Sequence, residues 1–123
     1  MTTDKRTIGV TPGNQRVLDA LMSTGTFATE NEAAKFAFAV AAKRGVEVGT
    51  ADGAGTKWNV GTFDHDQSLR LVVESIYEDV EEPYRLVEHL INAGLTLLDA
   101  GDDIPPDVFI EMFGDAKAQP QET

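Results

Sequence analysis

The feature that most constrains this chain is a ten-residue run, 33–42, which reads AAKFAFAVAA and is apolar almost all round a helix. A helix with that profile is usually central and buried. Thr29 and Glu32 precede the run as a capping box, in which a hydroxyl and a carboxylate satisfy free amides of the first turn. Gly45 follows as a terminator. We therefore expect the chain to fold around this one helix.

Three further segments are expected to pack around it. Thr11 and Pro12 are typical of the N-cap and first residue of a helix, which Gly25 would end. Another helix is predicted to begin near Pro83 and to end at Gly101. Between them, a third is predicted from apolar residues at helical spacing: Leu69, Val72, Val73, Ile76, Tyr77 and Val80. The pattern predicts a mainly α, compact four-helix domain.

The remaining segments are shorter and less regular. The first ten residues end in a polar–apolar alternation, which predicts a short N-terminal strand or arm. A small hairpin is predicted within residues 46–63, where apolar pieces flank a glycine-rich loop. Residues 107–113 are expected to form one or two helical turns, and residues 114–123 to be a disordered acidic tail. A chain of this length fits one domain, which we place at residues 1–113.

The chain contains no cysteine, which excludes disulfides, thiolate zinc sites and cysteine nucleophiles. Its first six residues are polar and lack the apolar region of a signal peptide. The longest apolar run, residues 36–42, is far shorter than the roughly 20 residues that span a bilayer. We expect a cytoplasmic protein that does not enter a membrane.

The net charge of −11 is unevenly distributed along the chain. Residues 1–45 carry six Lys/Arg and four Asp/Glu, whereas residues 46–123 carry four Lys/Arg and seventeen Asp/Glu. So negative a protein is repelled by DNA and by anionic lipid, because both carry negative charge themselves. Any direct nucleic-acid contact would therefore use the N-terminal part. We expect instead a protein partner that prefers an acidic surface.

The glycine-rich loop from Gly49 to Lys57 invites comparison with a phosphate-binding loop, whose amides and lysine hold phosphates. The nucleotide motif requires Gly-Lys-Ser/Thr at the entry to a helix. Here Thr56 separates Gly55 from Lys57, and Trp58 follows. We interpret the segment as a surface loop.

Asp64, His65 and Asp66 form a second candidate site, since carboxylates and imidazoles bind metals and transfer protons. Their position just before the third helix favours another interpretation, in which Asp64 or Asp66 caps that helix. His89, the only other histidine, lies within the fourth helix, so no spaced metal motif accompanies them. We predict no metal, no cofactor and no catalytic residue.

The densest run of acidic residues begins on the outer face of the third predicted helix and continues into the residues that follow this helix. Paired carboxylates do acid–base chemistry only when burial or a pocket tunes them, so a solvated surface is the first interpretation. The second interpretation is an acidic docking surface for a protein. The residues predicted to bind a partner are Glu74, Glu78, Glu81 and Glu82.

The N-terminal third supports an alternative hypothesis. A short strand, a Pro-initiated helix, a turn and a second helix occur in the order of a ribbon-helix-helix DNA-binding unit. In that fold two chains pair their strands, and alternate strand side chains enter the major groove. Alternation would point Ile8 and Val10 into the core and leave Gly9 outward. The DNA-contacting residues would be Lys5, Arg6 and Thr7.

Several of these segments together resemble a known bacterial family. The segment 29–45 (TENEAAKFAFAVAAKRG), the glycine-containing loop with residues 58–63, the amphipathic helix and residues 90–95 (LINAGL) carry the resemblance. It is similar to small accessory proteins of Dnd (DNA phosphorothioation) gene clusters, called Dnd system-associated protein 4. Their members show an Ala-rich "AA…G" helix and a late "NAGL" element. The resemblance covers residues 25–98.

This resemblance implies a role beside bacterial DNA modification, restriction or phage defence, without an assigned activity, and it identifies no functional residue. Our leading hypothesis is therefore a non-enzymatic accessory or interaction protein of such a system. It would dock on a protein of the DNA-handling machinery through its acidic helical face. The alternative is a small ribbon-helix-helix-like transcriptional regulator, and a homodimer is compatible with either hypothesis.

Overall fold

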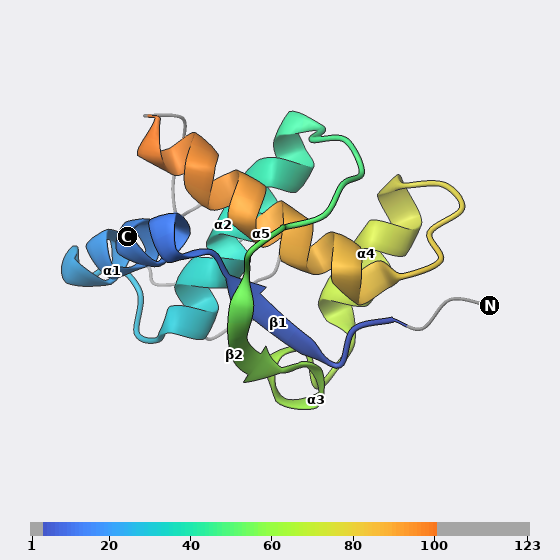
Figure 1. The fold of residues 1–123 in the computed structure, drawn as a ribbon, viewed down its shortest axis with the longest axis horizontal. Helices are drawn as coiled ribbons and strands as arrows, with labels where there is room; N and C mark the ends of the chain where they lie inside the picture. Colours follow the sequence, from blue (N-terminus) through green and yellow to red (C-terminus); the bar gives the residue numbers. More distant parts are fainter. Residues whose placement is uncertain (1–3, 101–123) are drawn as a thin grey trace, which may run out of the picture.

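The computed structural model of this chain describes residues 4–100. In chain order the elements are β1 (Thr7–Val10), α1 (Pro12–Ser23), α2 (Glu30–Arg44), β2 (Gly55–Asn59), α3 (Val60–Phe63), α4 (Ser68–Ile76) and α5 (Pro83–Asp99). The prediction of a mainly helical chain with a short N-terminal strand is confirmed (Figure 1). The helical turn predicted at 107–113 and the disordered tail predicted at 114–123 lie outside the described residues.

The central helix is α2, and it begins and ends as its sequence predicts. Thr29 Oγ1 accepts a hydrogen bond from the Glu32 amide at 3.2 Å, and the Glu32 carboxylate accepts one from the Ala28 amide at 3.0 Å. Gly45 follows the helix in the left-handed conformation, at φ 71°. All residues between positions 33 and 41 are buried except Lys35, which is half-buried. The helix thus forms the centre of the core.

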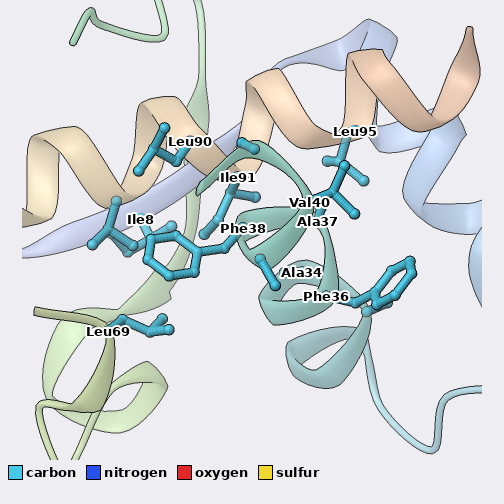
Figure 2. Close-up of a cluster of buried hydrophobic side chains, with 14 of the residues drawn as sticks. Ile8, Ala34, Phe36, Ala37, Phe38, Val40, Leu69, Leu90, Ile91 and Leu95 are labelled. Atoms are coloured by element: carbon cyan, nitrogen blue, oxygen red, sulfur yellow. The ribbon is translucent and has the colours of Figure 1, made fainter. Parts of the chain in front are cut away.

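The helix α5 crosses α2 at very close range (Figure 1). A Cβ atom on Gly94 would overlap the carbonyl oxygen of Ala37, so only glycine fits there. Around this crossing, Phe38 extends from α2 toward Ile8 and Leu69 (Figure 2). Apolar burial of this kind supplies most of the free energy that holds small domains together. The small residues of both helices therefore set how closely the two backbones pack.

The two strands form an antiparallel pair whose partners lie far apart in the sequence. β2 falls within the predicted 46–63 region, but its partner is β1, so a local hairpin between Val48 and Trp58 is not formed. The register shifts between Ile8 and Gly9, which leaves an extra residue on β2. The prediction that Gly9 points outward is wrong, because this bulge buries it against the Gly55 carbonyl.

The described residues contain five helices, so the predicted count of four is not confirmed, although each of the four expected helices is present. The additional helix, α3, is a single turn capped by Asn59, whose Oδ1 accepts the Gly61 amide at 2.8 Å. In addition, α4 ends at Ile76 and does not reach Val80. Tyr77 is extended (φ −118°, ψ 142°), and the side chain of Ile76 is 53% exposed although its spacing predicted burial.

Within residues 4–100, no helix combines the length and the apolar composition that a bilayer-crossing segment needs.

Candidate docking surface

The N-terminal segment is fixed to α5 by carboxylate and amide side chains. Asp4 accepts hydrogen bonds from the amides of Tyr84 (2.9 Å) and Arg85 (3.1 Å), which caps the first turn of α5. Glu82, at the N-cap position itself, makes no such bond. The sequence offered no signal for this cap, since about eighty residues separate Asp4 from the helix it caps.

The outer edge of β1 is occupied by α5. Glu88, which is 3% exposed, accepts the Gly9 amide at 2.8 Å. Asn92 donates to the Gly9 carbonyl at 3.1 Å and accepts the Thr11 amide at 3.0 Å. Because β2 lies on the other edge, β1 has neighbours on both sides within this chain. The arrangement therefore gives no support to strand pairing with a second copy.

The structure does not bring Lys5, Arg6 and Thr7 together as one cationic surface. Lys5 Nζ lies 3.1 Å from the Glu88 carboxylate, in an ion pair whose acidic member is buried. The Arg6 side chain is exposed, while its carbonyl accepts the Val60 amide at 2.9 Å. Thr7 Oγ1 lies 3.5 Å from Thr56 Oγ1. One of the two cations is therefore neutralised by the fold.

The Asp64-His65-Asp66 motif caps α4, as one of the two interpretations predicted. Asp64 is 2% exposed, and its carboxylate accepts the amides of Leu69 (3.0 Å) and Arg70 (3.2 Å). Asp66 Oδ1 accepts the Ser68 amide at 3.1 Å, and hydrogen bonds from Ser68 lower the pKa of the Asp66 carboxyl. His65 is exposed.

Asp64 also accepts a hydrogen bond from a tyrosine of another element. Tyr84 Oη lies 2.9 Å from Asp64 Oδ2, so the carboxylate also joins α4 to α5. Burial, followed by the hydrogen bond to Asp64, raises the pKa of the Tyr84 hydroxyl well above its usual range. In the part of the chain that the structure describes, no three His, Cys, Asp or Glu side chains are grouped for metal binding.

Lys57 of the glycine-rich loop region is engaged in structural contacts. Its Nζ lies 3.0 Å from a Glu30 carboxylate oxygen and 5.5 Å from the centre of the Trp58 ring. Trp58 in turn stacks on Phe63, with ring centroids 4.7 Å apart. The lysine therefore fastens β2 to the start of α2. The predicted loop is shorter than the segment Gly49–Lys57, because its last three residues belong to β2.

The four predicted partner-binding residues lie on α4 and in the connection that follows it, and not on one helical face. Glu74 is on α4 and pairs with Arg70 (3.2 Å). Glu78 and Glu81 lie in the connection between α4 and α5, and Glu82 is the N-cap residue that precedes α5. The premature end of α4 separates Glu74 from the other three.

Three of these four residues line a surface hollow of about 280 Å³, which we call the acidic hollow. Its walls are the segment 48–50, the connection 78–82 and the first turn of α5. Among the lining residues, Val48 is 67% exposed, whereas Leu86 is buried. The sequence predicted the carboxylates but missed Val48 and its segment.

The segment 46–50 is held over α5 by two ring side chains. The Tyr77 hydroxyl donates to the Val46 carbonyl, and His89 Nε2 lies 3.0 Å from the Glu47 carbonyl. Gly49 lies so close to His89 that an added Cβ would come within 2.8 Å of the ring. Burial raises the pKa of the Tyr77 hydroxyl. These backbone-directed contacts leave no pattern in the sequence, which explains why this wall was not predicted.

No protein-family model, curated protein or solved structure matches this chain. The two motifs on which the resemblance was based have clear structural roles. Gly94 of the "NAGL" element lies against Ala37 of the Ala-rich helix, and Asn92 binds the backbone beside β1.

Proposed function

We propose that this protein is an accessory or interaction protein that docks on a cationic protein partner through the acidic hollow. The observation that carries the proposal is the grouping of Glu78, Asp79, Glu81 and Glu82 around a hollow that also exposes Val48. Charged rims around apolar side chains are typical of protein interfaces, where the charges direct encounter and the apolar area adds affinity.

The charge at this rim is largely uncompensated. Glu82 pairs with Arg85 at 2.7 Å, and this contact raises the pKa of the guanidinium. Glu78, Asp79 and Glu81 form no ion pair with another of the described residues. Like charges held close together on a surface attract a partner of opposite sign and repel nucleic acid.

The buried acidic groups, by contrast, serve the fold. Asp64 caps α4, and Glu88 binds Lys5 and the Gly9 amide. Neither of these two carboxylates lines the acidic hollow. The carboxylates left for function are therefore exposed ones, which supports a binding role over acid–base chemistry.

Proteins that handle DNA carry cationic surfaces, and such a surface complements the acidic hollow. Together with the resemblance to Dnd-associated accessory proteins, this favours a partner from a bacterial DNA-modification, restriction or phage-defence system, acting in the cytoplasm. Docking would cover the partner's DNA-binding face, since the rim offers that face a competing set of negative charges.

The test is an affinity pull-down of tagged protein from its native cells, with and without nuclease, followed by mass spectrometry. The double variant Glu78→Gln/Glu81→Gln is compared with Asp19→Asn/Asp99→Asn, which removes the same charge from exposed positions outside the hollow. We expect a nuclease-resistant DNA-handling partner that is lost with the first variant and kept with the second.

Two results would overturn the proposal. One is equal recovery of the partner with both variants, since the hollow would then contribute nothing to binding. The other is recovery of DNA alone, sensitive to nuclease, which would favour the ribbon-helix-helix regulator.

A further inference from the structure

Resting on that proposed function, we infer that the acidic hollow binds an extended cationic segment of the partner, with one apolar side chain inserted between Val48 and Leu86. The partner would thus present a short linear motif, in which an aliphatic or aromatic residue is flanked by lysine or arginine. Size, apolar lining, a fixed wall and charge each support this occupant.

The size of the hollow fits a side chain. Its volume of about 280 Å³ is below the range of about 300–1,000 Å³ that is typical for drug-sized ligands. Val48, Val80 and Leu86 give it an apolar lining, and the exposed Val48 side chain gains most from being covered. Burying one apolar side chain strengthens binding by about ten- to a hundredfold, which is enough to anchor a peptide in register.

The wall that carries Val48 is fixed before any partner binds. Tyr77 holds the segment at Val46, His89 holds it at Glu47, and Gly49 packs directly on the imidazole. On the opposite side, the Glu82–Arg85 pair fixes the start of α5. Because the wall is preformed, less conformational entropy is lost when a peptide binds, so even a short peptide can bind measurably.

The charges determine what can flank the anchor. Glu78, Asp79 and Glu81 border the hollow on the side of the α4–α5 connection. A segment that lies in the hollow must pass these carboxylates, so cationic neighbours are favoured and acidic neighbours are repelled. The anchor provides affinity, and the flanking charges provide specificity and a dependence on salt.

The probe is a short fluorescent peptide with one central leucine, flanked on both sides by lysine and arginine. Its binding to the full chain is followed by anisotropy at low salt, and chemical shifts locate the site. We expect Val48→Asp to weaken binding at least about tenfold, because it places charge on the apolar wall. Leu71→Asp is the matched control, since Leu71 is similarly exposed (60%) on α4 and does not line the hollow.

Two altered peptides complete the design. Replacing the central leucine by serine should also weaken binding about tenfold, and replacing the cations by glutamate should abolish it. Circular dichroism and the shift spectrum verify that each variant remains folded. A further variant, Gly49→Ala, pushes a methyl group against the His89 ring that holds the wall, without changing charge, and should weaken binding as well.

The outcomes separate this inference from the proposed function. If the peptide does not bind, or binds regardless of its leucine and of Val48, the inference is overturned. Loss of the native partner with Glu78→Gln/Glu81→Gln would then still support docking, by a folded cationic surface. Retention of the native partner with that variant overturns the proposed function itself.

Discussion

Asp64 shows how one residue can determine a local structure. Its carboxylate accepts two amides of the α4 first turn and the hydroxyl of Tyr84, and it is almost fully buried while doing so. Removing a buried acceptor leaves several hydrogen-bond donors without a partner. This lowers the free energy of unfolding more than the loss of an exposed cap does. The adjacent Asp66 is such an exposed cap, so the two aspartates form a natural comparison.

We therefore expect Asp64→Ala to lower the free energy of unfolding by about 2–4 kcal/mol, combining a lost cap with unsatisfied buried donors. Asp66→Ala should lower it by about 1 kcal/mol or less. Urea denaturation of both variants measures the difference. Equal losses would show that burial of Asp64 contributes nothing beyond ordinary capping.

Tyr84 gives a prediction about alkaline pH. Burial and the Asp64 hydrogen bond raise the pKa of its hydroxyl above the ordinary value of 10.0. Above pH 10 the unfolded chain releases this proton while the folded chain retains it, so the stabilisation present below pH 10 is lost as pH rises. We expect Tyr84→Phe to flatten the fall of the melting temperature above pH 10.

Tyr77→Phe is the control, because the pKa of Tyr77 is also raised, by burial alone. Its effect on the alkaline slope should be smaller than that of Tyr84→Phe, since the Tyr84 hydroxyl also donates to the Asp64 carboxylate. A slope unchanged in Tyr84→Phe would contradict the prediction.

At the scale of elements, the contact between α2 and α5 depends on Gly94. Alanine there would overlap the Ala37 carbonyl, and backbone cannot yield as a flexible side chain can. We expect Gly94→Ala to destabilise the fold by about 1–3 kcal/mol, as overpacking does. A Cβ atom on Gly13 of α1 would meet no other described residue within 4 Å, so Gly13→Ala should stabilise the fold by about 0.4–1 kcal/mol. Thermal and urea unfolding of both variants test the contrast, and the same sign for both would contradict it.

The elements also show which parts of the fold local sequence can predict. α1 and α2 begin where Thr11 and Thr29 cap them, because capping is a short-range interaction. α4 was predicted too long because Tyr77 and Val80 are half-buried at helical spacing, although neither is helical. The pairing of β1 with β2 could not be predicted from local pattern, since its partners are separated by two helices.

The candidate site also has one part that the sequence predicts and another that depends on tertiary contacts. Composition alone marked the carboxylates Glu78, Glu81 and Glu82, because charge density is visible in a sequence. The hollow they line depends on the end of α4 and on the segment of Val48, both set by tertiary contacts. Those contacts join side chains to backbone carbonyls, which any residue could supply.

For the whole molecule, the net charge and the ion pair of Lys5 both argue against DNA binding. The chain carries a charge of −11, and Lys5, one of its few N-terminal cations, is paired with the buried Glu88. Removing Lys5 leaves the buried Glu88 carboxylate without its cation. This lowers the free energy of unfolding even when the pair is partly solvated. The residue should therefore matter for stability and not for nucleic-acid affinity.

We expect Lys5→Ala to lower the free energy of unfolding by about 1–3 kcal/mol, and Arg6→Ala, at an exposed side chain, to change it by less than about 0.5 kcal/mol. In anisotropy titrations at about 50 mM salt, the wild-type protein should show no binding to duplex DNA, because the charge of the whole molecule opposes it. Salt-dependent binding that Lys5→Ala/Arg6→Ala abolishes while the protein stays folded would reverse this conclusion. It would assign the N-terminal segment to DNA, and β1 would then have to leave α5 to pair with a second chain.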